Sequence, residues 1–425
     1  MKNLKITRWL TDVFRVLRSE LLLVFRDEGV ITFFLVLCAT YPIVYSLIYN
    51  PEVARDVAVV VVDDCRQQES RELARQLDAT PEVCVVDYAS NMQDARRMMN
   101  EKLCYGIVYI PRDYSLCLGR GETAHVMMYC DMGVLMRYKQ MLMGLTAVQK
   151  HITMQGIGKK LAVLTYQTGS VIGSRQVPLG NKSMGLASSL LLCIFILVLQ
   201  QSMLLGIGML RAGSRERRLR NGGADPMDVG AGVGATIVGK ALCHWMIYIV
   251  PTVYVLHFVP MFFDFPQNGH SLDIMAMALP FLLACSFMGQ CLQAFVNDRE
   301  SVFLAVVFTS IPFVFFTGIS WPRYATGPLW TALGNFVPST WASEAYILMQ
   351  SVGATLGQTS RHYAMLWVLS GVYFALAYCI ERWLLRPRYR RMAQYEAAEP
   401  GSLMREEYRR NATDVADTAA SGKIG

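Results

Sequence analysis

A short charged segment, Arg215-Glu216-Arg217-Arg218, directly follows a long apolar run and offers the clearest chemistry in the sequence. Arginines are expected where a chain leaves a membrane, so their positive charge alone is ordinary. That rule does not require the acid Glu216. From the residues alone, docking of another protein and ordinary positive charge at a membrane surface are both open for these four residues.

Two further ionisable residues lie within apolar sequence, where charge is costly and often functional. Lys240 lies one to two turns inside the apolar run 233–263, so a role in transport and simple packing are both open. Its long stem could also carry the ammonium group to the membrane surface, and we favour packing of this kind. Glu344 lies in a short apolar segment and could cap a helix, line an exit or bind a cationic substrate. For Glu344 we favour a structural role.

Catalysis by the chain itself has no support in the sequence. The segment 51–181 holds no Ser/His/Asp or Cys/His set that topology would bring together, and no cysteine spacing resembles a zinc site. The Gly-x4-Gly-Lys-Ser/Thr loop is missing, so the chain is not expected to bind nucleotide in the usual way. We therefore assign no catalytic, cofactor-binding or metal-binding residues. The net charge of +7 comes without a basic-aromatic patch, which argues against nucleic acid.

Eleven cysteines divide between two environments. Six fall within or beside apolar runs, where cysteine is usually a small apolar filler. In the segment 51–181, one or two disulfides and free thiols are both open. The cysteines of that segment are Cys65, Cys84, Cys104, Cys117 and Cys130.

Six long apolar runs must position these residues. The chain of 425 residues is 53% hydrophobic and only 17% charged, whereas soluble domains carry about 25% charged residues. Each run is near or above the roughly 20 residues that a helix needs to cross a membrane. The runs are 30–49, 184–210, 233–263, 272–296, 301–319 and 363–385. We therefore predict a polytopic α-helical membrane protein with six transmembrane helices.

Lysine and arginine concentrate in three flanks of these runs, which predicts that both termini are cytoplasmic. The flanks are residues 1–28, the loop 211–230 and the polar tail 386–425. The first flank leads into transmembrane helix 29–50, and the other five transmembrane helices occupy residues 182–385.

The N-terminal flank, residues 1–28, carries apolar residues at helical spacing. We predict an amphipathic helix on the cytoplasmic face of the membrane, which either anchors the first span or docks a partner. Its apolar stripe comprises Leu10, Val13, Phe14, Leu17, Leu21 and Val24, with Arg15, Arg18 and Glu20 between them.

Residues 51–181 form the one sizeable soluble segment, which this topology places outside the cytoplasm. Continuous apolar strands alternate with helical segments, and this pattern predicts an inserted α/β extracytoplasmic domain with its sheet covered on both faces. The expected strands are Val57–Val62, Val83–Asp87, Gly106–Ile110 and Ala124–Cys130, and the expected helices are Gln67–Asp78, Asn91–Lys102, Tyr114–Arg120 and about Gly133–Thr168. Gly169, Gly173, Pro178 and Gly180 are expected to break the last helix before the second span.

Residues 320–362 are predicted to lie on the outer side of the membrane, but their composition is too apolar for a solvated loop. Pro322, Pro328 and Pro338 divide the segment into two short helices. Short helices that dip into the membrane and return fit this pattern, provided that protein or water satisfies their ends.

The layout resembles the permease subunits of type-2 ABC transporters, in particular those with a large extracytoplasmic domain between the first two spans. Three stretches carry the resemblance, which covers nearly the whole chain. They are Arg26-Asp27-Glu28; Arg215-Glu216-Arg217-Arg218 followed by Gly239-Lys240; and Thr317-Gly318-Ile319-Ser320-Trp321-Pro322 followed by Val337-Pro338-Ser339-Thr340-Trp341 and Glu344. The second is similar to the family's "RERE…GT…GK" segment and the third to its "SGxxxP…PxxxxxE" pattern. The segment Asn221–Pro226 departs from the family, which usually starts a helix with Gly-Thr there.

The resemblance implies a permease subunit of an ATP-driven exporter in the bacterial inner membrane. Two such permeases, identical or sister chains, would pair, and cytosolic ABC ATPase subunits with ATP and Mg would dock beneath them. The segment Arg215–Arg218 would couple the permease to the ATPase. We assign the transport pathway or its gating to Lys240, Gly318, Pro322, Pro338 and Glu344.

Several points stay open on sequence grounds. A periplasmic adaptor could bind the outer domain, and the substrate is not readable, although the lack of a charged array within the membrane favours an amphipathic or lipid-like cargo. The alternative is a membrane receptor or scaffold whose segment 51–181 binds a partner without ATP-driven transport.

Overall fold

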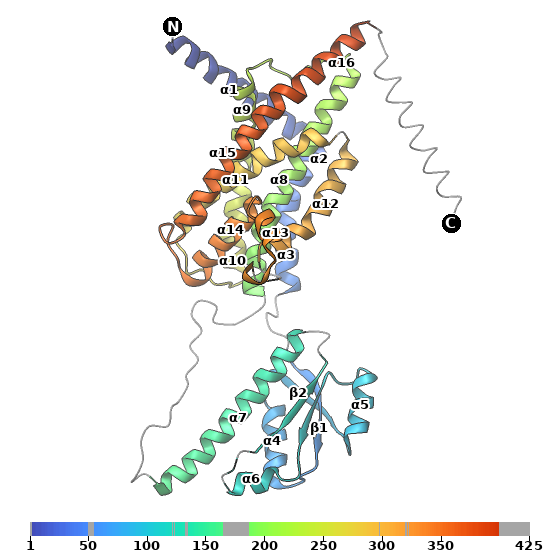
Figure 1. Cartoon of the computed structure of the whole chain (residues 1–425), viewed down its shortest axis with the longest axis vertical. Helices are drawn as coiled ribbons and strands as arrows, with labels where there is room; N and C mark the ends of the chain where they lie inside the picture. The colour runs from blue at the N-terminus through green and yellow to red at the C-terminus, as the bar shows by residue number, and fades with distance from the viewer. Residues whose placement is uncertain are drawn as a thin grey trace, which may run out of the picture. The chain divides into compact units, whose positions relative to one another are not determined.

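The computed structural model describes residues 2–49, 55–120, 122, 124–131, 135–164, 187–296, 298–318, 321 and 323–398. The chain divides into two compact units, which Figure 1 shows. One unit, the helical unit, comprises Met1–Asn50 and Pro178–Gly425, and the other, the α/β unit, comprises Pro51–Val177.

Six helices among the described residues are long and apolar enough to cross a membrane. They are Glu28–Ile48, Leu190–Arg220, Val233–Phe262, Ser271–Leu292, Arg299–Phe316 and Ser360–Gln394. The prediction of six spans is therefore confirmed, and the chain is a multi-pass membrane protein.

These spans correspond to the elements drawn in Figure 1. The first comprises α2 (Glu28–Ile31), η1 (Thr32–Val36) and α3 (Leu37–Ile48); the second lies in α8 (Ala187–Arg220); and the third comprises α9 (Val233–Val253), η2 (Tyr254–Phe258) and α10 (Val259–Phe262). The fourth is α11 (Ser271–Leu292), which η3 (Gln293–Phe295) follows, and the fifth is α12 (Arg299–Phe316). The sixth comprises α15 (Ser360–Ile380), η6 (Glu381–Leu385) and α16 (Arg386–Ala398).

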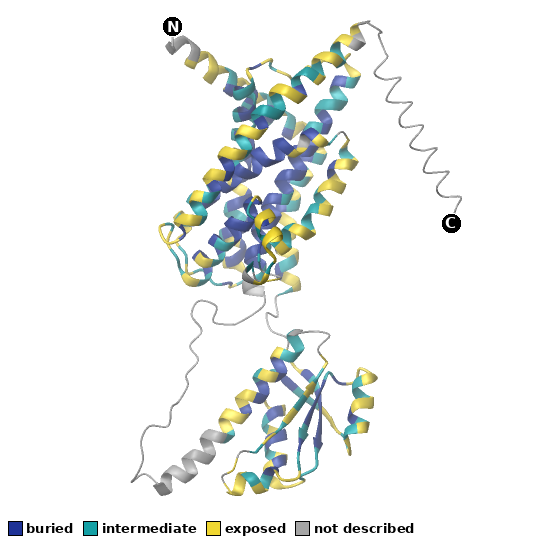
Figure 2. Cartoon of the chain, viewed as in Figure 1, coloured by how far each residue is buried: buried dark blue, intermediate teal, exposed yellow. Residues whose placement is uncertain are grey.

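The core of the helical unit surrounds α8, as the dark blue centre in Figure 2 shows. Phe34, Phe195, Tyr248, Phe281 and Tyr346 are fully buried there and come from five different segments. The helix α12, by contrast, leaves most of its apolar side chains exposed. Exposed examples are Phe303, Leu304, Val307, Phe308, Ile311 and Phe315. Because water would disfavour such a surface, this face of α12 is suited to lipid or to another membrane protein.

The N-terminal helix α1 (Lys2–Arg26) packs against α9 and the core through much of the predicted stripe, since Val24 is buried and Leu17 and Leu21 pack against the core. Val13 and Val16 are buried in that contact, but Leu10 and Phe14 are 54% and 66% exposed. Glu20, which the pattern places among polar residues, is only 6% exposed. The helix carries apolar residues on two faces, so its periodicity could not show which face would pack against protein.

Two short helices fill the segment between the fifth and sixth spans. They are α13 (Pro328–Gly334) and α14 (Pro338–Ile347), and the π-helical turn η5 (Leu348–Val352) continues the second. Each begins at a proline, which lacks the N–H that a first helical residue would leave unsatisfied. The helix α14 is almost wholly buried, whereas α13 exposes Leu329 and Trp330. A 3-10 turn, η4 (Arg323–Ala325), precedes them.

Two boundaries in the helical unit differ from the prediction. The segment 211–230 is not a loop throughout, because α8 continues to Arg220. Charged residues do not interrupt a helix, and arginine and glutamate both favour helical structure. The tail 386–425 likewise begins with the helix α16, and its residues 399–425 lie outside the described part of the chain. The breakers Gly169, Gly173, Pro178 and Gly180 also lie outside it.

The α/β unit is built around a four-stranded sheet with the order β2-β1-β3-β4. The strands β1, β2 and β3 are parallel, and β4 is antiparallel to β3. The strands are β1 (Val57–Asp63), β2 (Val83–Tyr88), β3 (Gly106–Ile110) and β4 (Met127–Cys130), and the helices are α4 (Gln68–Asp78), α5 (Met92–Asn100), α6 (Tyr114–Arg120) and α7 (Leu135–Leu164). Parallel neighbours need a crossover, and α4 and α5 supply it.

Both faces of the sheet carry helices. On one face Val59 and Val61 pack with Leu73 of α4 and Met141 of α7, and on the other Val60 packs near α5. The alternating burial of β1 follows from the opposite directions of successive side chains in a strand. All eleven cysteines of the chain are free thiols, so the alternative with disulfides is not realised in this structure.

Candidate functional site

The acid Glu216 is part of a cluster that joins the ends of three spans. The guanidinium of Arg299, at the start of α12, donates to Oε1 of Glu216 at 2.9 Å and to Oδ2 of Asp27 at 2.7 Å. A second bond from Arg299 Nη1 to Asp27 Oδ1, of 3.1 Å, makes the contact with Asp27 bidentate. Arg215 pairs with Asp298 at 2.7 Å in the same region. The beginning of α2, the end of α8 and the beginning of α12 are therefore tied together.

Asp27 has a second role at the start of the first span. Its Oδ1 accepts hydrogen bonds from the backbone N–H groups of Gly29 and Val30, so it caps α2. Burial raises the pKa of the Asp27 carboxyl, but the bonds from Arg299 and from these two N–H groups outweigh it, and the pKa lies below its usual value. Asp27 is therefore held as a carboxylate.

The basic residues Arg217 and Arg218 hold the segment that follows α8. Arg217 donates to both carboxylate oxygens of Asp225, at 3.0 and 3.1 Å, and Arg218 donates to Asp228 at 2.6 Å. Asp225 also accepts from the hydroxyl of Ser214 at 2.7 Å. These bonds fold the segment back onto α8, which gives a structural reason for the departure from the family pattern near Asp225.

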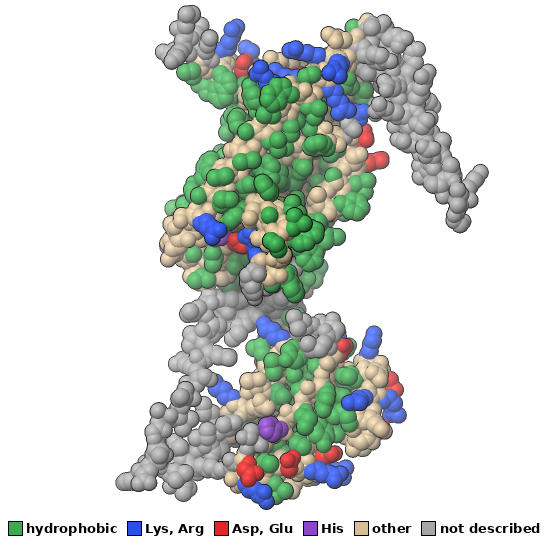
Figure 3. Space-filling view, viewed as in Figure 1, with side chains coloured by type: hydrophobic (Ala, Val, Ile, Leu, Met, Phe, Trp, Pro, Cys, Tyr) green, Lys and Arg blue, Asp and Glu red, His purple; other side chains and the backbone are tan. Residues whose placement is uncertain are grey.

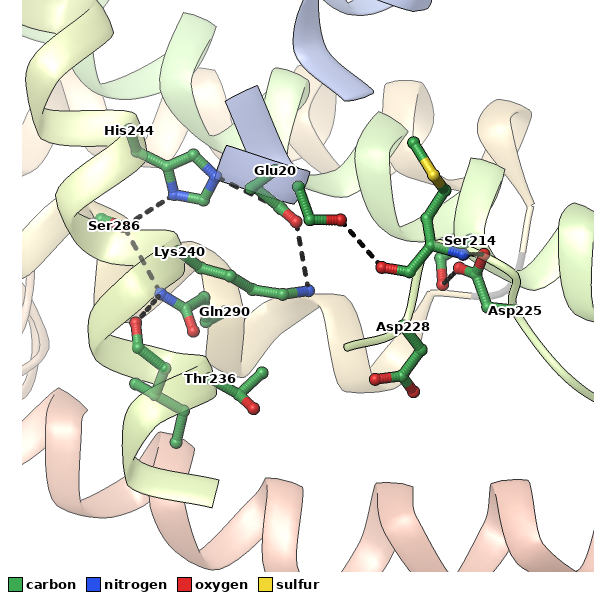
Figure 4. A network of polar contacts seen from close by, with 12 residues as sticks. Glu20, Ser214, Asp225, Asp228, Thr236, Lys240, His244, Ser286 and Gln290 are labelled. Atoms are coloured by element: carbon green, nitrogen blue, oxygen red, sulfur yellow. Dashed lines mark hydrogen bonds and ion pairs between the residues drawn. The ribbon is translucent and has the colours of Figure 1, made fainter. Parts of the chain in front are cut away.

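The side chain of Lys240 does not reach the surface without a partner, because it forms an ion pair with the buried acid Glu20. Its Nζ atom lies 3.8 Å from Oε2 of Glu20, and Nε2 of His244 lies 3.7 Å from the other oxygen of the same carboxylate. Figure 4 shows Lys240 and His244 pointing toward Glu20 from one face of α9. His244 Nδ1 shares a 2.9 Å hydrogen bond with Ser286 on α11. The network therefore joins α1, α9 and α11.

The carboxyl of Glu20 stays charged in this network. Burial raises the pKa of Glu20, but the charge of Lys240 and the contact with His244 outweigh burial, so the pKa lies below its usual value. A charged acid and a charged lysine can share a poorly solvated site only as a pair. Lys240 is therefore held by an ion pair to α1, a more specific arrangement than the packing that we predicted.

At the opposite end of the helical unit, Glu344 forms an ion pair with Arg323 and contacts the imidazole of His362. Arg323 Nη1 lies 2.8 Å from one carboxylate oxygen, and Nε2 of His362 lies 3.3 Å from the other. Arg323 precedes α13, Glu344 lies in α14 and His362 lies in α15. Glu344 thus fastens the short helices to the sixth span, in line with a structural role.

Gly318 lies beside this ion pair, and Pro338 lies at the start of the helix that carries Glu344. Gly318 has a φ of +81°, and a Cβ atom added to it would lie 2.8 Å from Cγ of Arg323. Pro338 begins α14, whose second residue, Ser339, donates its backbone N–H to the side chain of Gln200 on α8 at 2.9 Å. Pro322 lies outside the described residues.

The assigned residues therefore form two groups rather than one site. Arg215–Arg218 and Lys240 lie at the end of the unit that holds α1 and α16, called the Arg-rich end below, where Lys and Arg side chains gather in Figure 3. Gly318, Pro338 and Glu344 lie at the other end.

Sequence reasoning missed the partners of these residues as site residues: Glu20, Asp27, Asp225, Asp228 and Arg299. Two signals in the sequence point toward them. Arg299 stands in a tight charged turn between two apolar runs, and Asp27 is the centre of a motif that we quoted for the family but did not assign a role.

Within the described part of the chain, no group of three or more His, Cys, Asp or Glu residues could hold a metal ion. The candidate site consists of ion pairs between helix ends.

Comparison with known proteins agrees with this description. The family described as "ABC-2 family transporter protein" matches residues 29–379, which span all six candidate membrane helices except the end of the last. A search of curated proteins found no match. The resemblance noted from the sequence motifs is confirmed by the family match. The chain therefore belongs to the ABC-2 family of transporter proteins, as the membrane subunit that works with a separate ABC ATPase.

Proposed function

We propose that this chain is the permease subunit of an ATP-driven exporter and that its Arg-rich end receives the ATPase on the cytoplasmic side. The ATPase subunits, which carry ATP and Mg, would dock against the last turns of α8 at Arg215–Arg218. Their movement would open a path for a substrate from the cytoplasm or the inner leaflet toward the outside.

The cluster of Asp27, Glu216 and Arg299 is the observation that carries this proposal. It joins the first, second and fifth spans at one end. A movement of the C-terminal end of α8 would therefore be transmitted directly to α2 and α12 through charge-assisted hydrogen bonds. A single rigid helix end without such bonds would pass much less of that movement to its neighbours.

Orientation and assembly follow from charge and from apolar surface. The concentration of arginine at one end supports cytoplasmic termini under the positive-inside rule, and the bacterial inner membrane is the proposed location. The exposed apolar face of α12 supports pairing with a second permease, identical or sister. In this orientation the α/β unit lies outside the cytoplasm, where an adaptor could bind it.

An apolar cavity supports an amphipathic or lipid-like cargo. The cavity has a volume of about 410 Å³ and lies between α12 and α13, near the outer end in the proposed orientation. Its walls include Ile311, Phe315, Phe316, Trp321 and Trp330. Aromatic and aliphatic walls of this kind bind hydrocarbon rather than ions.

Purification of the tagged chain from native membranes tests the proposal. We expect a stoichiometric ABC ATPase to copurify and to be lost with Glu216→Lys, which reverses the charge of the only acid in Arg215–Arg218. Glu300→Lys is the matched control, since Glu300 is an exposed acid on the first turn of α12. An eluate without any ATPase, in a detergent that preserves known transporters, would instead support the receptor or scaffold alternative.

A further inference from the structure

A cavity of about 420 Å³ opens at the Arg-rich end of the helical unit. Its walls come from α1, the last turns of α8, α9 and α16, together with the segment that follows α8. The volume lies in the lower part of the range for small-ligand sites, about 300–1,000 Å³. It is therefore large enough for a small polar group.

The cavity carries more positive than negative charge. Its cationic side chains are Arg211, Arg217, Arg218, Lys240, Arg386 and Arg390, and its acids are Glu20, Asp225, Asp228 and Glu381. Each acid lies within 4 Å of one of these cations, through the pairs Arg217–Asp225, Arg218–Asp228, Lys240–Glu20 and Arg386–Glu381. Among the described residues, Arg211 and Arg390 have no acid at that distance. Two positive charges therefore line the cavity without an acid in salt-bridge contact, and Glu381 and Glu20 interact with Arg211 only at longer range.

The arginines at the centre of this wall also have unused hydrogen-bonding capacity. Arg211 and Arg218 both lie against the ring of Tyr389, with their guanidinium carbons 4.6 and 4.1 Å from its centroid. Within the described structure, the Nε–H group of Arg218 is buried without a hydrogen-bond partner. A buried donor left unpaired is costly, because it has lost its hydrogen bonds to water. A bound group with several acceptor oxygens would satisfy it.

Phosphate is the anion that fits these donors best. The planar guanidinium donates in a fork that matches phosphate oxygens, and several arginines around one cavity can share the oxygens of one phosphate. Carboxylates of the chain already occupy the paired cations, so the free capacity lies at Arg211, Arg390 and the Nε atom of Arg218.

The exposed apolar face of helix α1 indicates which class of molecule carries the phosphate group. Residues Val16, Ser19, Glu20 and Leu23 of α1 line the cavity, while the other side of the helix exposes large apolar side chains. These are Ile6, Trp9, Leu10, Phe14, Leu22 and Phe25. A helix with exposed aromatic and aliphatic residues lies in the membrane interface, at the level of the lipid headgroups. Basic pockets between membrane helices at this level bind lipid headgroups.

We propose that this cavity is a phosphate-binding site that holds the headgroup of an anionic membrane lipid through Arg211, Arg218 and Arg390. The site shares Arg218 with the segment that we propose for ATPase docking, but lipid binding to it does not require the ATPase. A bound phosphate is negatively charged and would contact arginines of both α8 and α16, so it would link the two helices. This link lies at the same end of the helical unit as the ion pairs of Glu20 and Glu216.

Lipid binding by the full-length protein in detergent tests the proposal. The probes are phosphatidylglycerol, phosphatidylcholine and inorganic phosphate, with bound lipid counted by native mass spectrometry and the thermal unfolding midpoint measured in parallel. We expect phosphatidylglycerol to bind and to raise the midpoint more than phosphatidylcholine, whose choline the arginines repel. Arg211→Gln combined with Arg390→Gln should weaken that binding at least tenfold.

Two further variants keep the outcome clear. Arg391→Gln is the matched control, because Arg391 is exposed on the same helix as Arg390 and does not line the cavity. Arg211→Lys keeps the charge and should keep part of the binding. If Arg211→Gln does not fold, Arg390→Gln alone tests the loss of binding. An equal effect of inorganic phosphate would support the phosphate site with a soluble ligand as its source.

Three results would overturn the site. They are equal lipid binding by the wild type and the double variant, an equal loss with Arg391→Gln, and a lack of binding to every probe. If the last result came with weaker ATPase binding by Arg211→Gln, the unpaired arginines would belong to a protein interface.

Discussion

Glu216 accepts a 2.9 Å hydrogen bond from Nε of Arg299, a residue 83 positions further along the chain. The pair joins the end of the second span to the start of the fifth. Their side chains are 45% and 34% exposed. An ion pair of this exposure stabilises a fold by only about 0.2–1 kcal/mol. Its contribution to the stability of the fold is therefore small, which leaves the proposed coupling as the effect to test.

This pair leads to a prediction for Glu216→Lys. The variant should fold, with a loss of less than about 1 kcal/mol, but should lose the coupling of ATP hydrolysis to transport. The new lysine would place a second cation against Arg299 and leave Arg215–Arg218 wholly basic. Thermal unfolding of the permease and ATP-driven transport after the ATPase is added to the reconstituted permease check the two parts, with Glu300→Lys as control. Normal coupled transport by Glu216→Lys would contradict the prediction.

A second prediction concerns the buried pair of Glu20 and Lys240. Glu20→Gln should destabilise the helical unit by about 3 kcal/mol, because it leaves Lys240 in a poorly solvated site without its counter-charge. Lys240→Met in the Glu20→Gln background should recover much of that loss. Denaturant titration of all four proteins gives the coupling energy. If the two losses simply add, the residues do not interact as an ion pair.

The third prediction is a pH dependence that arises from Asp225. Burial raises the pKa of this carboxyl, but the bonds from Arg217, Ser214 and a backbone N–H outweigh burial and lower the pKa below 3.8. Its contribution to stability is therefore complete above about pH 4 and is lost as the pH falls through the folded-state pKa. The thermal midpoint of the wild type should drop more between pH 5 and pH 3 than that of Asp225→Asn. Parallel curves for the two proteins would rule out this contribution.

The fourth prediction concerns Gly318, whose φ of +81° disfavours any other residue. Gly318→Ala should cost about 1–2 kcal/mol from the backbone alone, and its methyl group would displace Arg323 from Glu344. Gly371→Ala is the matched control, because an added Cβ there meets no atom within 4 Å. We expect a lower thermal midpoint for the first variant and an unchanged or higher one for the control. Equal midpoints would show that the strained turn adjusts freely.

Local patterns in the sequence were sufficient for most elements of this protein, although not for the end of α8 or for α16. Each apolar run had to form a helix long enough to satisfy its own backbone in a membrane, so six spans followed from length and composition. The alternation of strands and helices in 51–181 followed from period and turn residues, and Pro328 and Pro338 marked the starts of α13 and α14. These features depend on neighbours along the chain, and a single sequence records such neighbours directly.

Tertiary structure alone decided the partners of the charged residues. Arg299 meets Asp27, 272 positions away, and Lys240 meets Glu20 on a helix that the sequence described only as amphipathic. Hydrophobic periodicity says that a face is apolar, but it does not say which other face will cover it. An ion pair leaves little trace in the hydrophobic periodicity of a sequence. A single charged residue in a helix has the same effect on that periodicity whether its side chain contacts water or an oppositely charged partner. The identity of a buried pair therefore becomes visible only when the packing of the helices brings its two members together.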